Sequence, residues 1–168
     1  SITLMGTGGV SRDTGGRVRI LPASGAAITV DGGTPVTPMH LYNMTIGTIG
    51  GTSINQTGGS NLEGNWSNVN FISALNFDPE GVYASQCKFA AITTILVQAP
   101  EDLVFDACEF SGVVDLSLSI ITNVVFNGCL FTVNAKILIG AFHDLNITGN
   151  RFACTIDAIK FSAAITAS

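Results

Sequence analysis

The stretch LVFDACEF at residues 103–110 decides the fold, because it recurs at a fixed interval without gaps. VYASQCKF precedes it at residues 82–89, and VVFNGCLF and LNITGNRF follow it at residues 124–131 and 145–152. Successive copies therefore begin 21 residues apart. A constant period in this range is typical of solenoids, in which each repeat stacks on its neighbours. The second half of the chain is predicted to be a repeat structure.

The pattern within each copy predicts β-strands. Apolar residues stand at the first, third, sixth and eighth positions, except for one asparagine, in an alternation of period two that a pair of small or polar residues interrupts. Such alternation predicts a strand, a corner and a second strand. Further apolar runs follow at residues 95–97, 116–118 and 137–139. We therefore predict an all-β fold, a single-stranded parallel β-helix with coils of about 21 residues and three short strands per coil.

Stacked coils bring equivalent residues into columns with a spacing of about 4.8 Å along the solenoid axis. The eighth position then forms an inward column at Phe89, Phe110, Phe131 and Phe152, which Phe77 is expected to begin one coil earlier. The sixth position forms a second inward column at Cys87, Cys108, Cys129 and Asn150. Because parallel stacked side chains rarely offer the disulfide torsion of roughly 90°, we expect free thiols. Asn150 is expected to end the column as a hydrogen-bonded amide.

The first part of the chain is less regular than the repeats. Pairs of glycines separate short apolar runs at residues 8–9, 15–16, 32–33, 50–51 and 58–59. An open β-helix end exposes strand edges that need a cover. We interpret residues 1–60 as a Gly-rich N-terminal arm or cap with one or two irregular coils, and residues 61–168 as the β-helix proper.

A family resemblance rests on these repeats, and residues 82–152 carry it. The copy LNITGNRF looks like the repeat of right-handed parallel β-helix proteins, the pectate-lyase-like group. That group includes polysaccharide lyases and hydrolases, phage tailspikes and other virion proteins. The resemblance implies the fold and leaves the activity open, because one fold carries many functions.

Composition and charge argue against several partners. Charged residues make up 11% of the chain, and the net charge of −5 offers no basic patch to nucleic acid. The longest stretch without charge, residues 116–135, holds three asparagines and a glycine, so we do not expect a membrane span. His40 and His143 lie outside the cysteine column in sequence, so the chain offers no converging ligands, and we expect neither a metal nor another cofactor.

An enzymatic role is not expected. Asp106 and Glu109 are the best candidates for a catalytic carboxylate pair, which glycoside hydrolysis requires at a separation of about 5–9 Å. Neighbouring coils place Ser85 and Asn127 beside the first carboxylate, and Lys88 and Leu130 beside the second. No cluster of carboxylates is therefore predicted, and we expect no catalytic residues.

The third apolar run of each coil predicts an interface. Alternation breaks down there and both faces become apolar, which is typical of a strand that is buried on both sides. Leu96 and Leu138 are expected to point outward with Ser117 between them, and Ile120 and Ile121 extend the stripe. Such a stripe needs a covering partner, so we expect a homo-oligomer or attachment to a larger viral protein shell. Among oligomers, the resemblance to viral β-helix proteins favours a homotrimer.

These features favour a structural virion protein, either a cement or decoration protein of a phage capsid or a short spike segment, assembled in the host cytoplasm. The alternative is a carbohydrate-binding or polysaccharide-degrading β-helix module. In a binding module, exposed aromatic rings stack on sugars, and the only Trp and Tyr residues are Trp66, Tyr42 and Tyr83. They do not share one repeat position, so the sequence shows no linear platform for a glycan.

Overall fold

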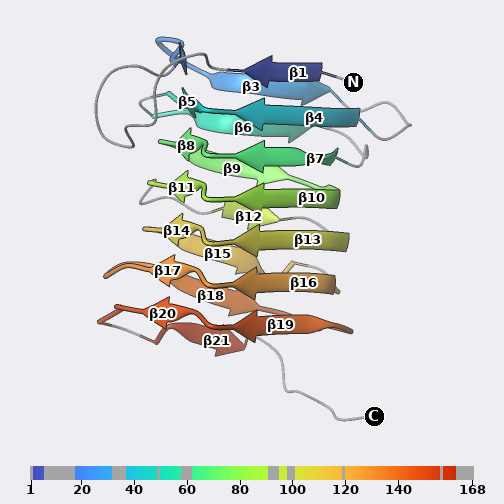
Figure 1. Cartoon of the computed structure of the whole chain (residues 1–168), viewed down its shortest axis with the longest axis vertical. Helices are drawn as coiled ribbons and strands as arrows, with labels where there is room; N and C mark the ends of the chain where they lie inside the picture. The colour runs from blue at the N-terminus through green and yellow to red at the C-terminus, as the bar shows by residue number, and fades with distance from the viewer. Residues whose placement is uncertain are drawn as a thin grey trace.

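The computed structural model describes residues 2–5, 18–31, 37–48, 50–57, 62–90, 95–97, 101–118, 120–155 and 157–161. Within these residues every regular element is a β-strand, and all strand pairings are parallel. Each pass of the chain adds one strand to each of three sheets, so that coils, or rungs, stack along one axis (Figure 1). The predicted fold class, an all-β parallel solenoid whose coils have the length of the sequence repeat, is confirmed.

Three seven-stranded sheets form the sides of the described part of the solenoid. The first sheet contains β1 (Ile2–Met5), β4 (Thr37–Tyr42), β7 (Leu62–Ser67), β10 (Pro79–Ser85), β13 (Glu101–Asp106), β16 (Thr122–Asn127) and β19 (Leu145–Thr148). The second sheet contains β2 (Val18–Ile20), β5 (Met44–Ile46), β8 (Asn70–Phe71), β11 (Lys88–Phe89), β14 (Glu109–Phe110), β17 (Leu130–Phe131) and β20 (Arg151–Phe152). The third sheet contains β3 (Ala26–Asp31), β6 (Thr52–Thr57), β9 (Ala74–Phe77), β12 (Ile95–Val97), β15 (Val113–Leu116), β18 (Lys136–Ile139) and β21 (Ile159–Phe161).

The first and second sheets keep the register that the repeat predicts. Val82 pairs with Leu103, which pairs with Val124, so each step along this column equals one period of the sequence repeat. The corner between the two sheets holds one residue of positive φ in each of six rungs, at Asn43, Asn68, Gln86, Ala107, Gly128 and Gly149. Only a left-handed residue turns the chain this tightly, and Asn and Gly adopt that conformation most easily. This requirement explains the small or polar pair that interrupts the alternation.

The core is an unbroken apolar column of stacked rings. Phe89 lies between Phe71 and Phe110 at centroid distances of 5.1 Å and 4.9 Å, with nearly parallel ring planes. The column continues through Phe131 to Phe152, which is only partly buried in the last rung. Phe71 precedes Phe89 in this column, because β8 pairs with β11. The expectation that Phe77 holds this place is wrong, since Phe77 belongs to the third sheet.

The third sheet departs from the predicted register. We expected Ser117 between Leu96 and Leu138, but Asp115 pairs with both of them. Val114 and Leu116 are fully buried and fill the core of this rung. The strand ends at Leu116, before Ser117. Ser117 instead donates from its backbone N–H and its hydroxyl to the Asp115 carboxylate.

The N-terminal strands belong to the same three sheets. Strands β1 to β6 form two rungs that stack on β7, β8 and β9, in line with the one or two irregular coils expected there. A division of the chain at residue 60 stays a prediction, as does a covering role for the first residues.

Candidate functional site

The cysteine column lies buried at the corner between the first and second sheets, and its thiols are free. The Cys108 thiol donates to the carbonyl of Ala84 at 3.3 Å, and its sulfur accepts from the backbone N–H of Cys87. Asn150 makes the same pair of bonds with its amide. Its Oδ1 accepts from the N–H of Cys129 at 2.7 Å, and its Nδ2 donates to a carbonyl at 2.8 Å. The Cys108 thiol and the Asn150 amide therefore bond backbone groups at equivalent positions of the preceding rung.

The Cys129 thiol is poorly suited to nucleophilic chemistry. The hydrogen bond with Cys108, and then burial, raise the pKa of Cys129 far above its ordinary value. Since the thiolate is the reactive form of cysteine, a protonated buried thiol is inert. We assign Cys87, Cys108 and Cys129 a packing and hydrogen-bonding role in the core.

The two carboxylates considered for catalysis lie apart from other acids in their columns. Asp106 stands between Ser85 and Asn127 and accepts hydrogen bonds from Asn127 at 2.8 Å and from the Tyr83 hydroxyl at 3.2 Å. Burial and the Asp106 carboxylate raise the pKa of that tyrosine. These contacts hold Asp106 in a polar network on the first sheet.

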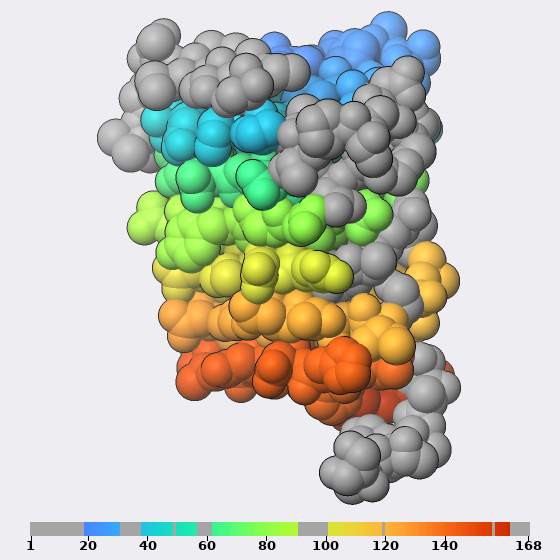
Figure 2. Space-filling view, turned by 90° about the vertical axis from the view of Figure 1, so that its right-hand side faces the viewer, coloured from blue at the N-terminus to red at the C-terminus, as the bar shows by residue number. Residues whose placement is uncertain are grey.

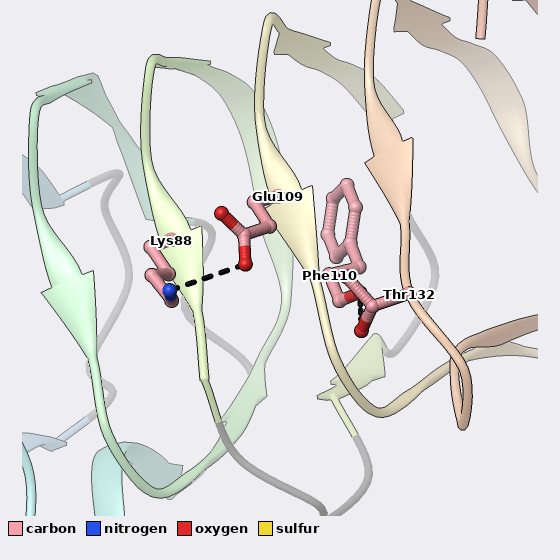
Figure 3. A network of polar contacts seen from close by, with 4 residues as sticks. All are labelled: Lys88, Glu109, Phe110 and Thr132. Carbon is pink, nitrogen blue, oxygen red and sulfur yellow. Dashed lines mark hydrogen bonds and ion pairs between the residues drawn. The ribbon is translucent and has the colours of Figure 1, made fainter. Parts of the chain in front are cut away.

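Glu109 forms an ion pair across the second sheet. Its Oε1 lies 3.1 Å from Nζ of Lys88 on the preceding rung, as Figure 3 shows. In the same view, the hydroxyl of Thr132 donates to the carbonyl of Phe110 at 3.1 Å and ties the next rung to this one. Both side chains of the ion pair are partly exposed, so its contribution to stability is about 0–1 kcal/mol.

A cluster of three acidic residues, which the sequence patterns did not single out, lies where the third sheet turns into the first. Glu80 pairs with Glu101 in adjacent strands, and Asp78 lies just before them. Burial, followed by the charges of Glu101 and Glu80, raises the pKa of Asp78. The described residues contain no group of three or more His, Cys, Asp or Glu side chains arranged to hold a metal ion. The main consequence of this acidic cluster is that the charges of Glu80 and Glu101 repel the charge of Asp78.

The residues predicted to form an apolar interface do not share one stripe. Leu138 is half-buried and lies between Asp115 and Lys160 in the third sheet, so its column contains charged residues as well as apolar ones. The side chain of Leu96 lies outside the described part. The expected exposure of Ile121 is wrong, because it is fully buried and pairs with Phe142 of the following rung. Ile120 is exposed, as expected.

An exposed apolar projection occupies the turn from the third sheet to the first, between β15 and β16. Leu118 and Ile120 have exposed fractions of 61% and 55%, and we call these two residues the corner knob. Figure 2 faces this edge of the solenoid and shows residues near 120, in light orange, projecting at its right-hand side. The apolar run at residues 116–118 predicts a strand that includes Leu118, but β15 ends at Leu116 and Leu118 lies in the turn.

Comparison with known proteins gives this chain no relative. No protein-family model, curated protein or solved structure matches this chain. No helix suited to crossing a lipid bilayer occurs in the part of the chain that the structure describes.

Proposed function

We propose that this chain is a structural protein that works through protein–protein contacts made at the corner knob, and that it is not an enzyme. The observation that carries the proposal is that two aliphatic residues of one turn, Leu118 and Ile120, are both largely exposed. Exposed apolar side chains that cluster on a surface mark interaction sites more often than single ones do. Burial against a partner removes their apolar surface from water and supplies the driving force for assembly.

The arrangement of the carboxylates supports a non-enzymatic role. Hydrolysis of a glycoside needs two carboxyl groups that face one another across the substrate. Asp106 and Glu109 have no acidic neighbour in their columns, and each is engaged by a hydrogen bond or an ion pair. Catalysis by these residues would require both to leave their present partners.

We further propose that the assembly is a virion, in which the chain is a capsid cement protein or part of a spike made in the host cytoplasm. This setting is supported by the resemblance of the repeat to pectate-lyase-like and tailspike-like β-helices. In this proposal the chain self-associates or attaches to a larger protein shell. A glycan-binding module remains the rival, and a glycan array that retains the chain on one class of sugar would favour the rival.

The test compares the double variant Leu118→Asp, Ile120→Asp with the control Val133→Asp. Val133 is also an exposed aliphatic residue, at 52%, but it lies at a different corner, between β17 and β18. The expected result is that the double variant stays folded by circular dichroism and fails to enter the particles that contain the wild-type chain, whereas the control enters them. Equal incorporation of the double variant and the wild type would refute the proposed contact.

A further inference from the structure

An apolar groove lies on the side of the solenoid away from the corner knob, at the turn from the second sheet to the third in the first three rungs. It has a volume of about 270 Å³, and six residues line it, namely Leu21, Pro22, Ala23, Gly47, Thr48 and Ile72. We call it the corner groove. Its walls include two exposed aliphatic side chains, with exposed fractions of 44% for Leu21 and 36% for Ile72.

The missing side chain of Gly47 shapes the corner groove. Leu21, Gly47 and Ile72 each follow the last residue of a second-sheet strand, so they stack on successive rungs. A Cβ at Gly47 would lie 2.5 Å from Cγ1 of Ile72, so any larger residue would displace that wall. The hydroxyl oxygen of Thr48 is buried and has no hydrogen-bond partner among the described residues. The groove is therefore walled mainly by apolar side chains, and its depth depends on the missing side chain of Gly47.

We propose that the corner groove receives the corner knob of a second copy of this chain. This inference rests on the proposed function, because it names the partner surface for Leu118 and Ile120. The chemistry of the two surfaces matches, since branched aliphatic side chains of the knob fill a groove walled by Leu21, Pro22 and Ile72. Burial of both surfaces in one contact gives an interface with an apolar centre.

The charges around the two surfaces are complementary. Glu101 and Asp102, both exposed, lie beside Thr122 and Asn123, which follow the knob in sequence, and they give its surroundings a negative charge. Arg19 is exposed and stands two residues before Leu21, beside the groove. Every described Lys and Arg lies on the second or third sheet, and the described strands of the first sheet contain none. The acidic surroundings of the knob in one copy would therefore lie against Arg19 of the next copy, an attraction that like-with-like contacts lack.

The position of the two surfaces determines the form of the assembly. The knob and the groove are different surfaces, so the contact is heterologous. The groove centres on the turn after β5 and the knob follows β15, three rungs further along the axis, which amounts to roughly 14 Å. Copies with parallel axes would therefore be staggered, and a staggered heterologous contact extends into an open chain. The contact therefore predicts assemblies that grow in size as the protein concentration rises, and not one closed oligomer.

Light scattering on the full chain tests the contact with one variant on each side. The knob variant is the double replacement Leu118→Asp, Ile120→Asp, and the groove variant is Ile72→Asp. We expect each variant to weaken self-association by about 30-fold or more, as the loss of a central apolar residue does in other interfaces. Val133→Asp is the control and should associate like the wild type. An equimolar mixture of the knob variant and the groove variant retains one intact knob and one intact groove, so it should form 1:1 dimers that grow no further.

The outcomes separate this inference from the proposed function. If the groove variant associates like the wild type, or if the wild type is a monomer at all concentrations, the groove assignment is overturned. Failure of the knob variant to enter native particles would still support the proposed function in either case. A photoreactive residue at position 118 provides an independent readout. Cross-links to the peptide around residues 19–23 or to Ile72 would support the contact, and cross-links confined to other regions of the chain would overturn it.

Discussion

Replacement of Phe110 by alanine tests the ring column directly. Phe110 is fully buried in a middle rung and stacks between Phe89 and Phe131, each at a centroid distance of 4.9 Å. It also makes edge contacts with Phe105 at 5.1 Å and Phe126 at 5.9 Å. Rungs above and below hold the strand in place, so the site cannot collapse around the cavity. We expect a loss of about 3–5 kcal/mol in the free energy of unfolding.

Phe152 supplies the matched control within the same column. It stacks on Phe131 at 4.6 Å, and it is only partly buried in the last rung. Loss of one aromatic pair and of partial burial should cost about 1.5–2.5 kcal/mol in Phe152→Ala. The two replacements remove the same atoms, so their difference measures the position in the column.

Urea denaturation followed by circular dichroism provides the measurement, with both variants compared at one pH. If the slope of the unfolding free energy against urea concentration is unchanged, a shift in the midpoint reports a change in stability alone. A cost below about 1 kcal/mol for Phe110→Ala, or equal costs for the two variants, would refute the stacked column as a main source of stability.

Three further predictions concern single positions. Ala107→Gly should stabilise the fold by about 0.5–1 kcal/mol in urea melts, because Ala107 has a φ of 50° and the next rung has Gly128 at the same corner. A loss of stability would show that the alanine backbone is not strained there. Cys108→Asn should keep stability within about 1 kcal/mol of the wild type and exceed Cys108→Ala, which leaves backbone groups unpaired, and melts in reducing buffer would show the order. Asp78→Asn should raise the melting temperature at neutral pH, because the folded-state pKa of Asp78 is raised. Its carboxyl group contributes stability below the ordinary pKa of 3.8, and that contribution is lost as pH rises through the folded-state pKa, so the variant and the wild type should differ at neutral pH and converge below that value.

The strands of the first two sheets could be predicted from the sequence because their spacing never changes between residues 82 and 152. The corner between them always takes two residues, one of them left-handed, so the apolar alternation resumes at the same position in each of these coils. The same spacing could not place the earlier column, since Phe71 precedes Phe89 by less than one full period. A search at one fixed period does not detect a shorter coil.

The third sheet could not be placed because the turn before it varies in length. Residues 90–94, 111–112 and 132–135 separate the second and third strands of successive coils. The predicted run at residues 116–118 is therefore displaced from the true partner of Leu96 by two residues, from Asp115 to Ser117. Side chains alternate with a period of two, so a slip of two keeps every side chain on the same face, and the apolar pattern cannot reveal it.

The candidate surfaces depend on turns, which explains how little of them the sequence discloses. Ile120 was singled out from its apolar character, and the structure leaves it exposed. Its neighbour Ile121 has the same character and is buried, because the turn directs one side chain outward and the next inward. The corner groove depends on the stacking of Leu21, Gly47 and Ile72, and both separations along the chain are longer than the repeat period.

The exchange of thiol for amide in the sixth position has a consequence for recognising coils of this type. Cys108 and Asn150 differ in polarity and in side-chain shape, yet each accepts a hydrogen bond from one backbone N–H and donates one to a carbonyl of the preceding rung. A profile that scores this column by residue similarity would penalise the substitution, and one that demands cysteine would miss the last coil. Defining the position by its dual donor and acceptor capacity would also match coils that carry asparagine in place of every cysteine.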